Sequence, residues 1–207
     1  VTRGGRRTAR FVSRVPIRPD FAVLSARYAE KHRKHAGVDL SVYYHPAHAW
    51  NVDRMLDAMA VSLDYYQANF GPYQFDHARI VELPSWWKGA QAFGGTIPYS
   101  ENAGFVSDYS VPETMDFVGG MTAHEMAHQW WAQQVANAEM EGALVLNETL
   151  AQYSALMVIK KTRGADQVRR YLLYELDDYL VGRAMDFNDE TPLARVGGQS
   201  YIAYKKG

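Results

Sequence analysis

The chain has 207 residues, of which 47% are hydrophobic and 22% charged, a composition typical of a globular protein with one large or two small domains. Its formal net charge of −1 argues against a strongly basic surface, so we expect no nucleic-acid partner. The absence of cysteine excludes a disulfide scaffold and leaves His, Asp and Glu as metal ligands. No apolar run approaches the roughly 20 residues of a membrane span, which predicts a soluble domain. Because the chain opens on Val1 without a signal peptide, we interpret it as an excerpt from a longer protein.

The first residues predict a solvated edge followed by strands. Residues 1–18 contain six arginines and no acidic residue, which favours an exposed segment; an arm that faces a membrane or a partner is the alternative. Residues 21–28 and 38–44 alternate in polarity, as half-buried strands do.

A long helix is predicted from about Asn51 to Phe70. Asn51 can cap its first turn, and Gly71-Pro72 would end it. Its apolar positions recur at helical spacing and predict one buried face. These positions are Val52, Met55, Leu56, Met59, Leu63, Tyr66 and Phe70.

The remaining chain predicts two extended segments and then helices. The extended segments cover 75–83 and 93–100. From Val111 the pattern is helical: Pro112 suits a first turn, and the helix continues through Thr122–Gln133. A loop at 135–143 precedes helices at about 145–163, ended by Gly164, and 165–182. Strands followed by helices indicate an α+β fold, a small mixed sheet before a mainly helical half.

Residues 124–128, His-Glu-Met-Ala-His, carry the strongest chemical signal. Residues four apart lie on one face of a helix, so His124 and His128 can bind one Zn²⁺. Glu125 lies beside such a metal without being a ligand and can take a proton from metal-bound water. This spacing is a recognised motif of zinc proteases.

A catalytic zinc needs a third protein ligand and an open position. Glu148, near the start of the next predicted helix, is the candidate, and Glu139 and Glu141 in the preceding loop are weaker rivals. The other histidines show no ligand spacing and are interpreted as surface or core residues. They are His32, His35, His45, His48 and His77. Trp130 and Trp131 favour packing on the core, with the lining of a substrate cleft as the alternative.

Residues 124–131, followed by Asn147-Glu148, resemble the aminopeptidase N family of zinc metallopeptidases, gluzincins with a thermolysin-like catalytic domain. Three further segments are similar to family elements. They are Phe70-Gly71-Pro72-Tyr73, Ile97-Pro98-Tyr99-Ser100-Glu101 and Tyr204-Lys205-Lys206-Gly207. The resemblance implies a catalytic domain at 31–207, truncated at its C-terminus, after the end of a β region or linker at 1–30. It also implies one Zn²⁺, a peptide substrate, and Tyr204 as hydrogen-bond donor to the oxyanion, with Tyr201 as the fallback.

Two departures from the family pattern stand out. Nineteen residues separate His128 from Glu148 where the family usually has eighteen, and we assign the extra residue to the loop at 135–143. The family's Gly-Ala-Met-Glu-Asn strand corresponds to residues 89–93, which implies that Gly89, Ala90 and Gln91 bind substrate. Ala92 then replaces the glutamate that binds the substrate's α-amine, and Gln91 is a weaker partner for a cation.

These observations predict zinc-dependent, aminopeptidase-like peptide hydrolysis by metal-bound water that Glu125 activates. The alternative is a non-catalytic, zinc-containing peptide-binding or regulatory domain of a membrane protein, because Ala92 removes the amine-binding acid. A metal-free structural relic is a third interpretation. The pattern also resembles a branch in which the domain is fused to multi-span transporter-type membrane proteins of bacteria. The sequence does not predict a localisation.

Overall fold

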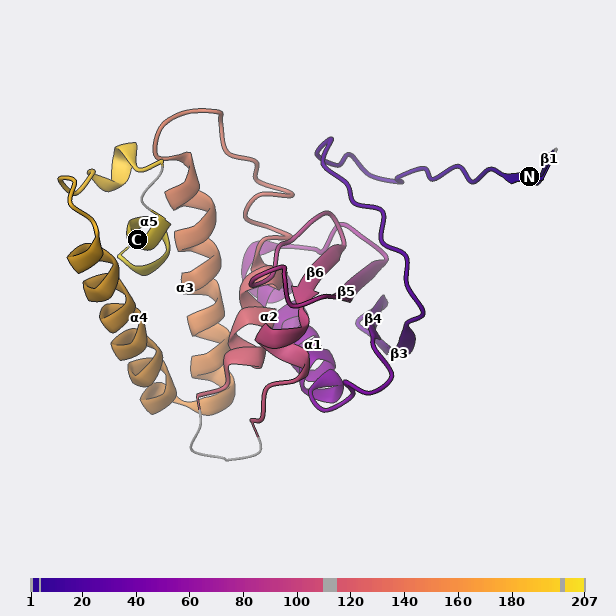
Figure 1. Ribbon diagram of the computed structural model, residues 1–207, viewed down its shortest axis with the longest axis horizontal. Coiled ribbons are helices and arrows are strands. Elements are labelled where there is room, and N and C mark those ends of the chain that lie inside the picture. The colour runs from indigo at the N-terminus through magenta and orange to yellow at the C-terminus, as the bar shows by residue number, and fades with distance from the viewer. Residues whose placement is uncertain (1, 4, 110–114, 198–199, 207) are drawn as a thin grey trace.

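A mixed four-stranded sheet forms one half of the computed structural model, which describes residues 2–3, 5–109, 115–197 and 200–206 (Figure 1). The strands lie in the order β3 (Ala29–His35), β4 (Val38–Tyr44), β5 (His77–Leu83) and β6 (Thr96–Ser100). β3 and β4 are antiparallel, whereas β4, β5 and β6 are parallel. Val42, Ile80 and Ile97 form one row across the three parallel strands, and each is at most 1% exposed. This row lies in the main hydrophobic core.

The predicted strand at 21–28 is wrong. Of the described N-terminal residues, Thr2–Arg3 (β1) and Arg6–Arg7 (β2) form a short antiparallel pair, and the next strand begins at Ala29. Phe21 and Val23 are 77% and 87% exposed, so the alternation of this segment faces no core. The strand instead lies further along the chain, because Ala36 and Gly37, both at positive φ, make a two-residue hairpin turn that pairs β3 with β4.

The long helix α1 spans Val52–Phe70, as predicted, and its apolar face is buried except for Phe70, which is 37% exposed. Gly71 ends the helix at φ 105°, a conformation that favours glycine. Asn51 occupies the N-cap position of α1, as predicted, but its side chain forms no capping hydrogen bond. Its side chain instead donates to the carbonyl oxygens of Gly104 and Ser107 at 2.7 and 2.9 Å. It thereby ties the start of α1 to the five-residue π-helical turn η1 (Glu101–Phe105) that follows β6.

The helix that carries His124 and Glu125 is α2 (Phe117–Ala127), and His128 directly follows it. Asp116 caps it by accepting a hydrogen bond from the Gly119 amide at 2.9 Å. The predicted extension to Gln133 is wrong because the chain turns after Ala127, and the Val135 amide bonds back to the Trp130 carbonyl. Pro112 lies outside the described residues.

Helices α3 (Ala143–Arg163) and α4 (Ala165–Met185) form the other half, followed by the short turn η2 (Leu193–Arg195) and α5 (Ser200–Lys205). In Figure 1, α2 lies between the sheet and α3, and α4 is outermost. The predicted strands-then-helices order, and with it the α+β class, is confirmed. In the described parts of the chain, we find no helix with the length and hydropathy of a membrane span.

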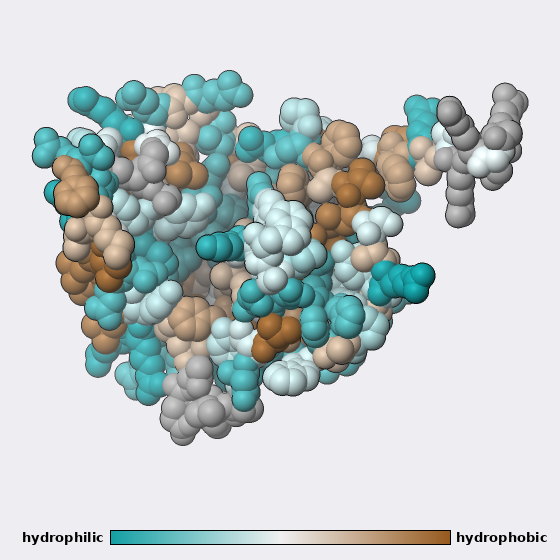
Figure 2. Space-filling view, viewed as in Figure 1, coloured by the Kyte–Doolittle hydropathy of each residue, from teal (hydrophilic) through white to brown (hydrophobic). Residues whose placement is uncertain are grey.

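Figure 2 shows a mainly hydrophilic face, with hydrophobic side chains along the edge that α4 forms. Several apolar residues of α4 are about half exposed, in contrast to those of α1. They are Leu172, Leu173, Leu176, Leu180 and Val181.

Trp130 packs on the core, as predicted for it. It is 2% exposed, its ring centroid lies 5.4 Å from that of Tyr66, and its indole N–H donates to the Gly71 carbonyl at 3.0 Å. We expect Trp130→Ala to lower the free energy of unfolding by about 3–5 kcal/mol, because it leaves a large cavity. Chemical denaturation would measure this, with Trp86→Ala as control. Trp86 is 76% exposed, so its loss should change stability by less than about 0.5 kcal/mol; equal effects would contradict the assignment.

Candidate metal centre

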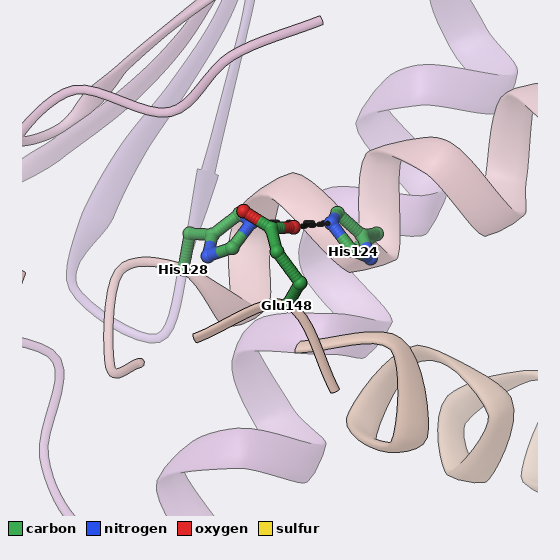
Figure 3. Close-up of side chains that lie close together, drawn as sticks. All are labelled: His124, His128 and Glu148. Carbon is green, nitrogen blue, oxygen red and sulfur yellow. Dashed lines mark hydrogen bonds and ion pairs between the residues drawn. The ribbon is translucent and has the colours of Figure 1, made fainter. Parts of the chain in front are cut away.

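Three side chains from α2, its C-terminal end and α3 point toward one another: His124, His128 and Glu148 (Figure 3). The two Nε2 atoms are 3.1 Å apart, and each lies 3.2 Å from Glu148 Oε2. Ligands placed 2.0–2.1 Å from a tetrahedral zinc are roughly 3.3 Å from one another. The side chains therefore already have the mutual spacing of three zinc ligands.

The other nitrogen of each imidazole has a hydrogen-bond acceptor. His124 Nδ1 lies 2.8 Å from Gln152 Oε1, and His128 Nδ1 lies 2.9 Å from the Trp131 carbonyl oxygen. These acceptors favour a proton on each Nδ1, which leaves both Nε2 lone pairs directed at the same space. Two lone pairs and a carboxylate oxygen repel one another at this distance unless a proton or a metal ion lies between them. The donor set thus fits a divalent metal ion.

Glu148 is negatively charged in this setting. Burial raises the pKa of its carboxyl group, but hydrogen bonds with His124 and His128 outweigh that effect and lower the pKa to about 2. For His128, burial lowers the pKa, and the adjacent carboxylate of Glu148 more than offsets this and raises it. The rivals Glu139 and Glu141 are exposed in the connection between α2 and α3 and lie outside the cluster.

A series of polar contacts extends from His124 Nδ1 through Gln152 to α4 and α5. Gln152 Nε2 donates to Glu175 Oε1 at 3.0 Å, and Glu175 Oε2 lies 2.6 Å from Lys205 Nζ. Gln152 therefore links a candidate ligand to α4 and α5. The motifs in the sequence do not predict this role for Gln152. The signal was its position one helical turn after Glu148, which places both residues on the same face of α3.

We expect Gln152→Ala to weaken zinc binding 10- to 100-fold, because His124 then loses the acceptor that fixes its Nδ1–H. Zinc affinity measured by chelator competition would show this. Gln133→Ala is a suitable control, since its side-chain amide donates to the Ala92 carbonyl, and the substitution keeps the backbone amide that donates to the His128 carbonyl. Unchanged affinity in Gln152→Ala would show that the contact does not orient the imidazole.

Glu125 is buried next to the two imidazoles, and within the described residues its Oε2 has no hydrogen-bond partner. Burial raises the pKa of this carboxyl group; the imidazoles of His124 and His128 lower it, and Glu148 raises it further. A buried carboxylate with one free oxygen beside a metal can exchange a proton with a water molecule.

Tyr204, on α5, reaches the same site from the C-terminal end of the chain. Its ring stacks on that of His124, with centroids 6.4 Å apart, and it is 38% exposed. Burial and the nearby carboxylate of Glu148 raise the pKa of its hydroxyl group. The hydroxyl therefore stays protonated and can donate a hydrogen bond. The fallback, Tyr201, instead contacts Asp186 at 3.2 Å.

Residues 89–93 lie antiparallel beside β6. The Ser100 amide donates to the Gly89 carbonyl, Ala90 pairs with Tyr99, and the Gln91 amide donates to the Pro98 carbonyl. Gln129, which directly follows His128, fastens this edge to the metal centre. Its amide group accepts from the Gly95 N–H at 2.8 Å and donates to the Phe93 carbonyl at 3.0 Å. The roles of Gly89, Ala90 and Gln91 in substrate binding stay predictions.

Comparison with known proteins decides the family. The profile of the peptidase family M1 domain matches residues 52–196, more than half of the chain. This chain belongs to peptidase family M1. The resemblance inferred from the sequence is thereby confirmed at the level of the family, and membership implies a metal ion, typically zinc.

Several curated relatives of this M1 domain are aminopeptidases. "Probable aminopeptidase 1" of Sulfurisphaera tokodaii is 32% identical over 114 residues, 55% of this chain and 14% of the relative. Endoplasmic reticulum aminopeptidase 1 of Homo sapiens is 29% identical over 153 residues, 73% of this chain and 15% of the relative. Aminopeptidase N of Lactococcus lactis subsp. cremoris is 29% identical over 125 residues, which are 59% of this chain and 15% of the relative. The matched segments thus cover only about one seventh of the length of these relatives.

Proposed function

We propose that this M1 domain hydrolyses peptide bonds with one Zn²⁺ held by His124, His128 and Glu148. The observation that carries the proposal is the convergence of three ligand atoms at 3.1–3.2 Å, with a buried, partly unpartnered Glu125 beside them. Membership of family M1 and the aminopeptidase names of the relatives support the reaction class. We further propose that residues 31–207 form a thermolysin-like catalytic domain.

The side chains take separate roles in this reaction. When bound, zinc polarises the scissile carbonyl and lowers the pKa of a coordinated water to about 7. Glu125 accepts a proton from the attacking water through Oε2, which has no hydrogen-bond partner among the described residues, and then delivers it to the leaving amine. The Tyr204 hydroxyl donates a hydrogen bond to the developing oxyanion.

The segment 89–93 would hold the substrate as an added strand along this edge of the sheet. Ala92 offers no carboxylate to the α-amine of a peptide. Its carbonyl oxygen instead accepts from Gln133 Nε2 at 3.3 Å. We therefore propose that recognition of a free amino terminus is weak, and that peptides are held mainly through their backbone.

Paired peptides with free and acetylated amino termini test this function on the zinc-loaded protein. Cleavage of both forms at comparable kcat/KM is the expected result. Cleavage of the free form alone would show that another group binds the α-amine. Tight binding of peptides without cleavage of either would overturn the proposal and favour the non-catalytic peptide-binding domain.

We expect Tyr204→Phe to lower kcat by about 10²–10³-fold with little change in KM, because the lost hydrogen bond forms to the oxyanion and not to the ground-state carbonyl. Steady-state kinetics would measure it. Tyr201→Phe provides a matched control on the same helix, because Tyr201 contacts Asp186 and lies outside the metal cluster. If Tyr201→Phe lowered kcat more than Tyr204→Phe does, Tyr201 rather than Tyr204 would be the donor to the oxyanion.

A further inference from the structure

A second group of metal-ligating side chains lies at the end of the sheet. His48 follows β4, Glu82 is in β5, and Glu101 begins the turn after β6, so all three lie near the C-terminal ends of neighbouring parallel strands (Figure 1). One ligand atom of each lies within 4.8 Å of the others. The group shares neither a residue nor a helix or strand with the centre between α2 and α3.

Backbone amides orient both carboxylates toward His48. The His45 N–H donates to Glu82 Oε2 at 2.5 Å, and the Ser85 N–H donates to Glu101 Oε1 at 2.8 Å. The second oxygen of each carboxylate faces the same imidazole nitrogen: Glu82 Oε1 is 2.5 Å and Glu101 Oε2 is 4.0 Å from His48 Nδ1. Each carboxylate therefore has one anchored oxygen and presents the other to a shared point, as ligands supported by an outer shell do.

Among the residues that the structure describes, no lysine or arginine neutralises the negative charge of this group. Glu82 is only 4% exposed, yet in the described ranges neither it nor Glu101 forms an ion pair with a lysine or arginine. A buried carboxylate is unfavourable unless it is paired or coordinates a metal. A single imidazole shared by two carboxylates leaves a net negative charge, which a divalent cation would neutralise.

We propose that His48 Nδ1, Glu82 Oε1 and Glu101 Oε2 bind a divalent transition-metal ion at a second site, independent of the proposed peptidase function. A mixed imidazole and carboxylate set suits zinc and related ions better than calcium, which takes oxygen ligands. The distances of 2.5 and 4.0 Å lie on either side of the roughly 3.3 Å expected between zinc ligands. Binding thus replaces the His48–Glu82 hydrogen bond, and any proton on Nδ1 passes to solvent.

The consequence of such an ion is structural. The three ligands join the loop before α1, the end of β5 and the turn after β6. Asn51, three residues after His48, already ties α1 to that turn. A metal at this point would hold together the end of the sheet. Ser100, which precedes Glu101, bonds to Gly89, so this end adjoins the segment proposed to hold substrate.

The test is the number of zinc ions per chain, measured by elemental analysis after dialysis against Zn²⁺ and by calorimetric titration. We expect two equivalents in the unmodified protein and one in His124→Ala/His128→Ala, which lacks the first site. Adding Glu101→Gln to that double variant should lower the affinity for the remaining zinc ion at least tenfold or abolish its binding. Glutamine keeps the acceptor for the Ser85 N–H, so this variant should retain the fold, and circular dichroism would check it.

His32→Ala is the matched control. His32 also lies between two carboxylates, Glu30 at 3.4 Å and Asp39 at 3.5 Å, but they approach opposite ring nitrogens and cannot surround one ion. This variant should keep both equivalents. The proposal is overturned if the double histidine variant binds no zinc, or if its remaining zinc is unaffected by both Glu101→Gln and His48→Ala. This test measures zinc binding and not peptide hydrolysis. The proposal of a second metal site and the proposed peptidase function can therefore fail separately.

Discussion

Glu125→Gln should retain zinc and lose peptide hydrolysis by roughly 10²–10⁴-fold in kcat, the usual contribution of a general base. Glutamine matches the size of the buried glutamate but cannot accept a proton at the reaction's pH. Because Glu125 lies beside the three candidate ligands and is not one of them, metal content should stay at the level of the unmodified protein. Single-turnover kinetics together with elemental analysis would give both quantities on one sample.

Glu139→Gln is the matched control for this change. Glu139 is exposed in the connection between α2 and α3, so the same chemical substitution should leave kcat unchanged there. Hydrolysis that survives in Glu125→Gln at the unmodified rate would remove Glu125 from the mechanism, even if zinc remains bound.

Glu148→Gln should weaken zinc binding by more than the 10- to 100-fold that outer-shell changes cause, and hydrolysis should fall with it. The charged oxygen that lies 3.2 Å from both imidazoles is replaced by a neutral amide, so the charge that attracts the ion is lost. Competition with a chromogenic chelator would measure the affinity, and added zinc should restore part of the activity.

The same measurement on Glu141→Gln distinguishes the rival ligands. Glu141 is exposed and outside the cluster, so its substitution should leave zinc affinity unchanged. A loss of affinity in Glu141→Gln with tight binding in Glu148→Gln would show that the loop supplies the third ligand in solution.

The features that the sequence predicts well depend on local patterns. The helical spacing of Met55, Met59 and Leu63 identifies the buried face of α1, and Gly71 marks its end. His124 and His128 need only one turn of helix to lie side by side. The α+β order follows in the same way, from the succession of strand-like and helix-like segments.

The features that the sequence does not predict depend on contacts between distant residues. Alternation at 21–28 is uninformative because none of the described strands pairs with this segment, and Phe21 and Val23 are exposed. Asn51 has the residue type of a helix cap, yet carbonyl groups more than fifty residues away compete successfully for its amide. His48 has no ligand spacing along the chain, and its carboxylate neighbours are identified only by the parallel pairing of β5 with β6.

The long connection between α2 and α3 has a consequence for folding. The two imidazoles come from one helix and meet through local structure, whereas Glu148 must arrive by the docking of a second helix that begins at Ala143. We therefore expect the third candidate ligand to join the other two late in folding, when this long-range contact forms. Zinc should bind weakly to a chain in which only α2 has formed and tightly to the native state, and this difference adds directly to the free energy of folding. In an unfolding experiment, release of the ion would thus report the separation of α3 from α2 rather than the melting of either helix.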